Sequence, residues 1–110
     1  MTVETYPDNA VRLEGFAGDA FYMLCEVKDN GSVVDLTGAT IDFELGPLTE
    51  ASSGVTVTNG NAAGTITIEA NDTAMAAITA GVHQISVRYT ISGCSTTLFT
   101  GTYTAKESVI

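Results

Sequence analysis

Apolar and polar side chains alternate with a period of two along most of the chain, which is the pattern of β-strands that bury one face. The clearest example runs from Phe21 to Lys28, and a second runs from Thr40 to Leu45. Glycine, asparagine and proline interrupt the alternation about every 8–12 residues, as turns between short strands do. Further strands are predicted near residues 11–14, 32–35, 55–57, 65–69, 83–91 and 95–104.

One short segment predicts a helix. Asn71, Asp72 and Thr73 are residue types that cap helix N-termini, and Ala74–Ile78 follow them before Gly81 ends the segment. Many short strands with close turns favour two packed sheets, whereas a parallel sheet would need a helix between successive strands. We therefore predict an all-β fold: an immunoglobulin-like antiparallel β-sandwich of seven or eight short strands with one short helix.

The length of 110 residues is enough for one hydrophobic core and too short for a second. We expect residues 10–110 to form this single β-sandwich domain. Residues 1–9 are mostly polar and include Pro7, so we expect an N-terminal arm. An arm of this kind can add a strand to the exposed sheet edge of a neighbouring molecule.

The charge balance limits the possible partners. The chain has 13 acidic and 4 basic side chains, for a net charge of −9. Binding to nucleic acid needs clustered lysines and arginines, whereas the four basic residues here are scattered along the chain. No apolar stretch approaches the roughly 18 residues of a membrane-spanning helix. We expect neither nucleic acid nor a membrane as a partner.

Enzymatic candidates in the sequence are few. His83 is the only histidine, and a dyad with Cys25 or Cys94 can be considered. However, Cys25 lies in the apolar set of its strand, where cysteine behaves as a small hydrophobic residue, and His83 begins the face that continues with Ile85. We therefore favour structural roles for these residues. A disulfide between the two cysteines is possible, but a chain with its own core does not need one.

Acidic residues offer two weaker candidates. Asp42 and Glu44 share a strand face about 7 Å apart, a separation that could suit a glycosidase pair. The chain has no tryptophan to stack a sugar, so we interpret them as solubilising charges. The Asp29-Asn30-Gly31 and Asn71-Asp72 segments lack the spacing of a calcium-binding loop, and we interpret them as a turn and a helix cap. We expect no catalytic residue, cofactor or metal.

Exposed apolar residues are the better candidates for function. Tyr22 and Leu24 lie opposite the apolar set of their strand, so this strand is apolar on both faces. Either the strand is internal and partly covered by the N-terminal segment, or the second face docks a neighbouring subunit. Phe16, in a glycine-rich turn, is a candidate plug or interface anchor. With Tyr6 and Pro7 of the arm, these residues form the predicted interface.

Several short segments occur in a characteristic order. Gly18-Asp19 precedes the first long strand, and Asp-Leu-Thr-Gly-Ala at residues 35–39 precedes the next. A Thr/Ala-containing helix segment at residues 72–75 and Gly81 come before a later strand, and Leu98–Thr104 closes the series. This order resembles small virion proteins of tailed bacteriophages and prophages, including the N-terminal domains of baseplate upper proteins. The resemblance covers residues 15–104.

The resemblance implies a non-enzymatic virion protein that is multimeric within the particle. Its partners would be other phage virion proteins: tail, fibre or major capsid protein. A place at the tail or baseplate, as a fibre or baseplate adaptor, is favoured, with a capsid cement or decoration protein as the alternative. A cell-surface or glycan adhesion domain and, last, a small hydrolase that uses His83 remain open.

Overall fold

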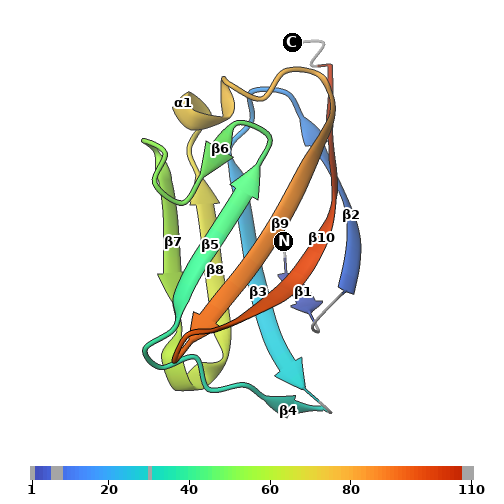
Figure 1. Cartoon of the computed structure of the whole chain (residues 1–110). Helices are drawn as coiled ribbons and strands as arrows, with labels where there is room; N and C mark the ends of the chain where they lie inside the picture. The colour runs from blue at the N-terminus through green and yellow to red at the C-terminus, as the bar shows by residue number, and fades with distance from the viewer. Residues whose placement is uncertain (1, 6–8, 30, 108–110) are drawn as a thin grey trace.

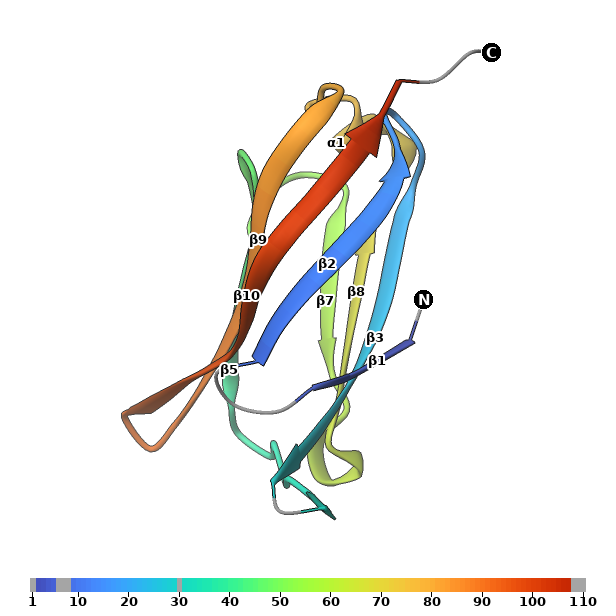
Figure 2. The same cartoon turned by 90° about the vertical axis from the view of Figure 1, so that its right-hand side faces the viewer.

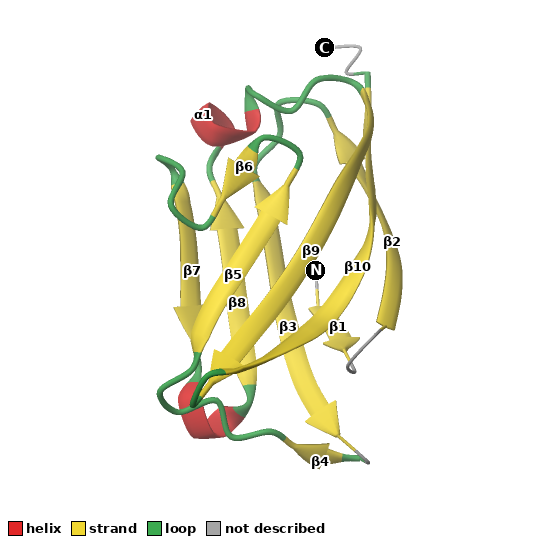
Figure 3. Cartoon of the chain, viewed as in Figure 1, coloured by secondary structure: helices red, strands yellow, loops and turns green. Residues whose placement is uncertain are grey.

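The computed structural model describes residues 2–5, 9–29 and 31–107. Ten strands in these residues form two five-stranded sheets that pack face to face (Figure 1). Sheet A consists of β1 (Thr2–Thr5), β3 (Phe21–Asp29), β4 (Ser32–Val33), β7 (Val55–Asn59) and β8 (Thr65–Ala70). Sheet B consists of β2 (Asn9–Phe16), β5 (Thr40–Leu45), β6 (Leu48–Thr49), β9 (Gly81–Ile91) and β10 (Cys94–Lys106). The predicted all-β, immunoglobulin-like sandwich is confirmed (Figure 3).

Most neighbouring strands are antiparallel, and two pairs are parallel. The order in sheet A is β1-β3-β8-β7, with β4 paired to β3, and in sheet B it is β2-β10-β9-β5-β6. The parallel pairs are β1 with β3 and β2 with β10. Residues 2–5, within the segment for which the sequence indicates an arm, pair with Leu24–Val27. β3 is therefore an internal strand over that half of its length.

The alternation along each strand produces the core. On β3 the apolar set that begins at Phe21 is buried, and the side chains between its members are exposed or half-buried. Inward residues of β8, in the same sheet, and of β9 and β10, in the opposite sheet, pack with this set into one core. The largest fully buried side chains are Phe99, Met23, Leu36, Leu45, Ile66, Ile68, Met75, Ile78, Ile85, Leu98, Val27 and Val87.

A β-bulge in β10 breaks the alternation. The register with β9 shifts between Thr97 and Phe99, so two consecutive side chains, Leu98 and Phe99, are both fully buried. A bulge inserts one extra residue and thereby changes which residues of the strand point inward. Beyond the bulge, Tyr103 and Ala105 face the core.

The strand predicted at residues 32–35 is shorter in the structure. β4 ends at Val33, and the backbone N–H of Val34 continues the β3–β4 register with one more hydrogen bond, to the carbonyl of Val27 at 3.0 Å. Asp35 then accepts hydrogen bonds from the hydroxyl of Thr37 at 2.6 Å and from its N–H at 2.9 Å. The hydrogen bond from the Thr37 hydroxyl and, second, the one from its N–H lower the pKa of Asp35. The same two bonds stabilise a turn where the sequence predicts the end of a strand.

The short helix lies where capping residues predict it. α1 (Asp72–Met75) begins directly after Asn71, whose side chain accepts a hydrogen bond from the N–H of Ala74 at 2.8 Å. It begins two residues earlier than predicted, and the chain after Met75 continues as hydrogen-bonded turns to Ile78. No helix in the described part of the chain is long and apolar enough to span a membrane.

We expect Asn71→Ala to lower the free energy of unfolding by about 1 kcal/mol, because the first turn of α1 loses its side-chain acceptor. Asn71→Asp keeps an acceptor oxygen and should cost less. Urea unfolding followed by circular dichroism measures both, and equal losses for the two variants would contradict the capping role.

Candidate functional site

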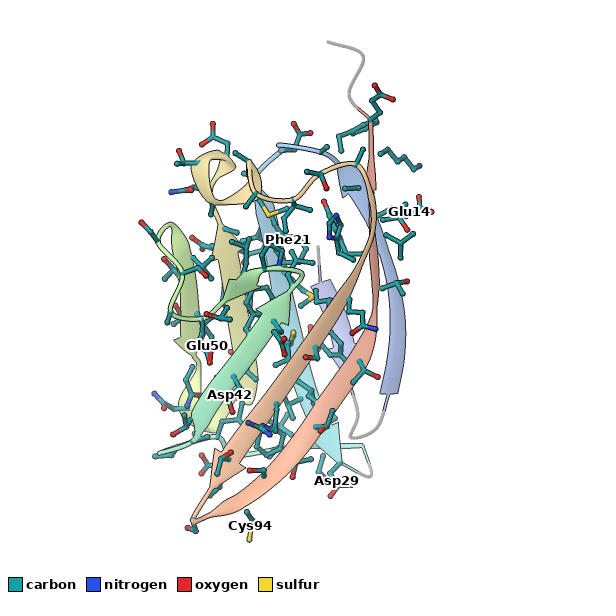
Figure 4. The ribbon with its side chains drawn as sticks, turned by 45° about the horizontal axis from the view of Figure 1, so that its top comes forward. Glu14, Phe21, Asp29, Asp42, Glu50 and Cys94 are labelled. Carbon is teal, nitrogen blue, oxygen red and sulfur yellow. The ribbon has the colours of Figure 1, made fainter. Side chains whose placement is uncertain are left out.

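The structure does not assemble a catalytic dyad from His83. The Nε2–H of His83 donates to the carbonyl of Thr79 at 2.7 Å, so the ring is held by its own loop. In the β9–β10 ladder His83 pairs with Tyr103, whereas Cys94 pairs with Ile91, eight positions further along. At about 3.3 Å per residue these positions are roughly 26 Å apart, and Figure 4 shows Cys94 at the tip of the hairpin.

Cys25 is a core residue. It is fully buried and free, and Cys94 is exposed and free, so the two do not form a disulfide. Burial raises the pKa of the Cys25 thiol to about 12. Because the thiolate is the nucleophilic form, a thiol held neutral in the core does not act as a nucleophile. The interpretation of Cys25 as a small hydrophobic residue fits this environment.

The carboxylate of Asp42 is paired with an arginine. Oδ2 of Asp42 accepts hydrogen bonds from Arg88 at 2.9 Å and 3.1 Å, and the two residues face each other on β5 and β9. Glu44, two residues further along β5, is exposed. Both side chains are partly exposed, and Asp42 lies on the outer, polar face of sheet B (Figure 4). This arrangement fits solubilising charges on a solvent-exposed face better than it fits a glycosidase carboxylate pair.

The two segments considered for calcium have the predicted structural roles. Asp29 pairs with Ser32 across the β3–β4 turn, where Gly31 has a φ of +79°, and Asn71 caps α1. Among residues 2–5, 9–29 and 31–107, no group of three or more His, Cys, Asp or Glu side chains is placed to hold a metal ion.

The predicted interface residues divide into three groups. Tyr6 and Pro7 lie outside the described residues. Leu24 is half-buried and lies opposite Thr2 in the β1–β3 pair, so on this strand the N-terminal segment does provide a neighbour. Phe16 and Tyr22 are different, because they are 49% and 48% exposed and rank among the large apolar side chains that the fold leaves in water.

Phe16 and Tyr22 line one hollow of about 310 Å³, which we call the β2–β3 hollow. It lies where β2 ends and β3 begins, and Figure 2 shows these two strands on the side of the sandwich that faces the viewer. β1 reaches along β3 only as far as Leu24, so it does not pair with the first residues of β3. The lining residues are Glu14, Gly15, Phe16, Asp19, Ala20, Phe21, Tyr22 and Tyr103.

A tight turn fixes the position of Phe16. Its carbonyl accepts the N–H of Asp19 at 3.2 Å, and Gly18 has a φ of +85°, which residues with a side chain rarely adopt. The N–H of Ala17 donates to the carbonyl of Lys106 at 2.8 Å, which extends the β2–β10 pairing by one residue. The turn therefore places Phe16 and Asp19 together at the rim of the hollow.

Buried aromatic rings form the floor. Phe21 and Tyr103 pack edge to face with ring centres 5.6 Å apart, and both are almost fully buried. The Tyr103 hydroxyl lies directly over Gly15, so close that a Cβ atom at position 15 would clash with it. The hollow therefore depends on a glycine at this position.

A second hollow of about 390 Å³ adjoins the first and shares Ala20, Phe21 and Tyr22 with it. Glu69 lines this second hollow and lies directly opposite Tyr22 in the β3–β8 pair. We call the two hollows together the docking surface. Tyr22 stands between them, with acidic side chains on both sides.

The rim of the docking surface carries three carboxylates, those of Glu14, Asp19 and Glu69. Glu14 pairs with Lys106 at 3.0 Å in an exposed ion pair, which contributes little stability. Within the described part of the chain, Asp19 and Glu69 form no ion pair. Burial and, second, the negative charge of Asp19 raise the pKa of Tyr103. The surface is thus apolar at its centre and negative at its rim.

Two of the predicted interface residues, Phe16 and Tyr22, line these hollows, and their role as an interface stays a prediction. The exposed aromatic residues stood out because they interrupt polar positions. Glu69 and Gly15 were missed, because their roles depend on strand register and on the packing of Tyr103, which no local pattern reveals.

Comparison of the sequence with protein-family models finds no match, and comparison with curated proteins finds none. Among solved structures, the chain is similar to the N-terminal domain of ORF48 of phage TP901-1. The TM-score is 0.54 at 16% sequence identity, and the match covers 96% of this chain and 99% of the other. The resemblance to phage proteins is thus confirmed at the level of the fold.

We expect the stability contributed by Cys25 to fall as pH rises above its ordinary pKa of 9.0. Between pH 9 and about 12 the unfolded thiol loses its proton while the buried one keeps it, so deprotonation favours the unfolded chain. The stability advantage of the parent chain over Cys25→Ala, measured by urea unfolding, should therefore shrink from pH 8 to pH 10.5. A constant difference would show that burial does not raise the pKa of the Cys25 thiol.

We expect Gly15→Ala to lower the free energy of unfolding by about 1–3 kcal/mol, because the added methyl group clashes with the Tyr103 hydroxyl. The same substitution should cost less in a Tyr103→Phe background, where the hydroxyl is absent. Denaturant unfolding of the two single variants and the double variant measures this coupling. Strictly additive losses would contradict the predicted clash.

Proposed function

We propose that this chain is a structural component of a tailed phage particle, where it binds other virion proteins at the tail or baseplate. One observation carries the proposal: nearly the whole chain matches nearly the whole length of a phage protein domain. The order of Gly18-Asp19, the Asp-Leu-Thr-Gly-Ala segment and the closing strand supports the tail site, because it resembles the N-terminal domains of baseplate upper proteins.

A structural role needs surfaces that other proteins can bind, and the fold offers two kinds. The first is the docking surface with its exposed Phe16 and Tyr22. The second is the set of sheet edges at β7 and β6, opposite the edges formed by β1 and β2. β7 reads Val-Thr-Val-Thr-Asn, with no charge or proline to discourage a further strand. Within this proposal the chain is repeated by the symmetry of the particle.

The residues considered for catalysis agree with a binding role. His83 is hydrogen-bonded to its own loop, Cys25 lies in the core and Asp42 is paired with Arg88. Each of these side chains has a structural partner or environment that accounts for its presence. A non-enzymatic module that holds other virion proteins together is therefore the function we propose.

The location of the protein in the particle tests the proposal. We expect gold-labelled antibody against this chain to mark the tail tip of intact phage particles in electron micrographs. Antibody preabsorbed with the purified protein is the control and should leave the particles unlabelled. Label over the head would identify a capsid decoration protein instead. Particles without specific label would contradict a virion role altogether.

A further inference from the structure

We propose that the docking surface binds an arginine side chain of a partner protein, with the guanidinium group against the rings of Phe16 and Tyr22 and within reach of the rim carboxylates. This inference rests on the proposed function, because it describes how the module would hold another virion protein. It assigns a chemical class of ligand to a surface whose shape and charge are described above.

Two aromatic side chains are exposed at this surface. Phe16 and Tyr22 are each about half exposed, whereas the neighbouring ring of Phe21 is buried in the core. Both line the β2–β3 hollow, so a ligand in that hollow contacts both residues. Two aromatic side chains at one concave site form a centre that a planar group can cover.

Carboxylates line the same two hollows as the rings, those of Glu14 and Asp19 in one and that of Glu69 in the other. Among the side chains that the structure describes, Lys106 pairs with Glu14. A neutral apolar ligand would leave this negative rim without a partner. A guanidinium group satisfies both features, because it stacks on aromatic faces and donates hydrogen bonds to carboxylates in a planar fork.

The arginine comes from a different protein, because this chain is strongly acidic. The chain has only 4 basic side chains against 13 acidic ones. Of these, Arg88 is paired with Asp42 and Lys106 with Glu14. Two copies of so acidic a chain repel each other, and a basic segment of a different protein is attracted. The partner is therefore a protein that presents an arginine on a basic surface.

A peptide titration tests the inference on the intact chain without phage particles. The probe is acetyl-Gly-Arg-Gly-amide, and the matched control is the same peptide with citrulline, which has nearly the same shape but no charge. In ¹⁵N-resolved NMR spectra at low salt, we expect the arginine peptide to shift amide signals of residues 15–22 and 69 saturably. The citrulline peptide should leave them nearly unchanged.

Variants of the chain separate the ring and charge contributions. Tyr22→Leu and Phe16→Leu keep an apolar side chain without a ring, and each should weaken binding about twofold to fivefold, whereas Tyr22→Phe should retain it. Asp19→Asn should weaken binding by a similar factor. Glu44→Gln removes the same charge from the outer face of sheet B and should have no comparable effect. The dispersed spectrum of each variant shows that it is folded.

Two results would overturn the inference. Equal binding of the arginine and citrulline peptides would show that the guanidinium charge is not recognised. Equal weakening by Asp19→Asn and Glu44→Gln would show attraction to net charge, not a site. Because the titration uses purified protein, its failure is distinct from failure of the proposed function, which the location of the protein in particles decides.

Discussion

The edge-to-face contact between Phe21 and Tyr103 holds the two sheets together at the end of the sandwich where β2 passes into β3. Phe21 belongs to sheet A and Tyr103 to sheet B, and Phe43, also of sheet B, stacks on Phe21 with ring centres 6.5 Å apart. Such contacts add about 0.5–1.5 kcal/mol each to the free energy of burying the rings. Because β2 pairs with β10 beside Tyr103, this cluster also fixes where the turn after Phe16 lies.

The surface chemistry of the sandwich is uneven around this cluster. The outer face of sheet B carries rows of polar side chains, such as Thr100, Ser86 and Glu44 in direct register, and is readily solvated. The side between β2 and β3 instead combines half-exposed rings with a negative rim. A protein whose charge is spread evenly would have no preferred side for a partner, and this distribution provides one.

The sequence predicted the sandwich well, because burying one face of a strand imposes a period of two that turns interrupt at regular intervals. It failed where long-range packing overrides the local pattern. The bulge at Leu98 and Phe99 changes the inward set of β10, and the parallel pairing of β1 with β3 depends on contacts between distant segments. The hollow between β2 and β3 is another example: the exposed rings of Phe16 and Tyr22 are visible locally, but their meeting in one hollow requires the register of both sheets. Their role as an interface stays a prediction.

The position of Gly15 beneath the Tyr103 hydroxyl divides the surface into positions that do not tolerate substitution and positions that do. The floor is part of the core, so a larger residue at position 15 would disturb the packing of both sheets. The exposed residues Phe16, Asp19 and Tyr22 are solvated, and replacement of such residues costs little stability. If the surface binds a partner as proposed, a few substitutions at these exposed positions change the partner while the scaffold stays the same.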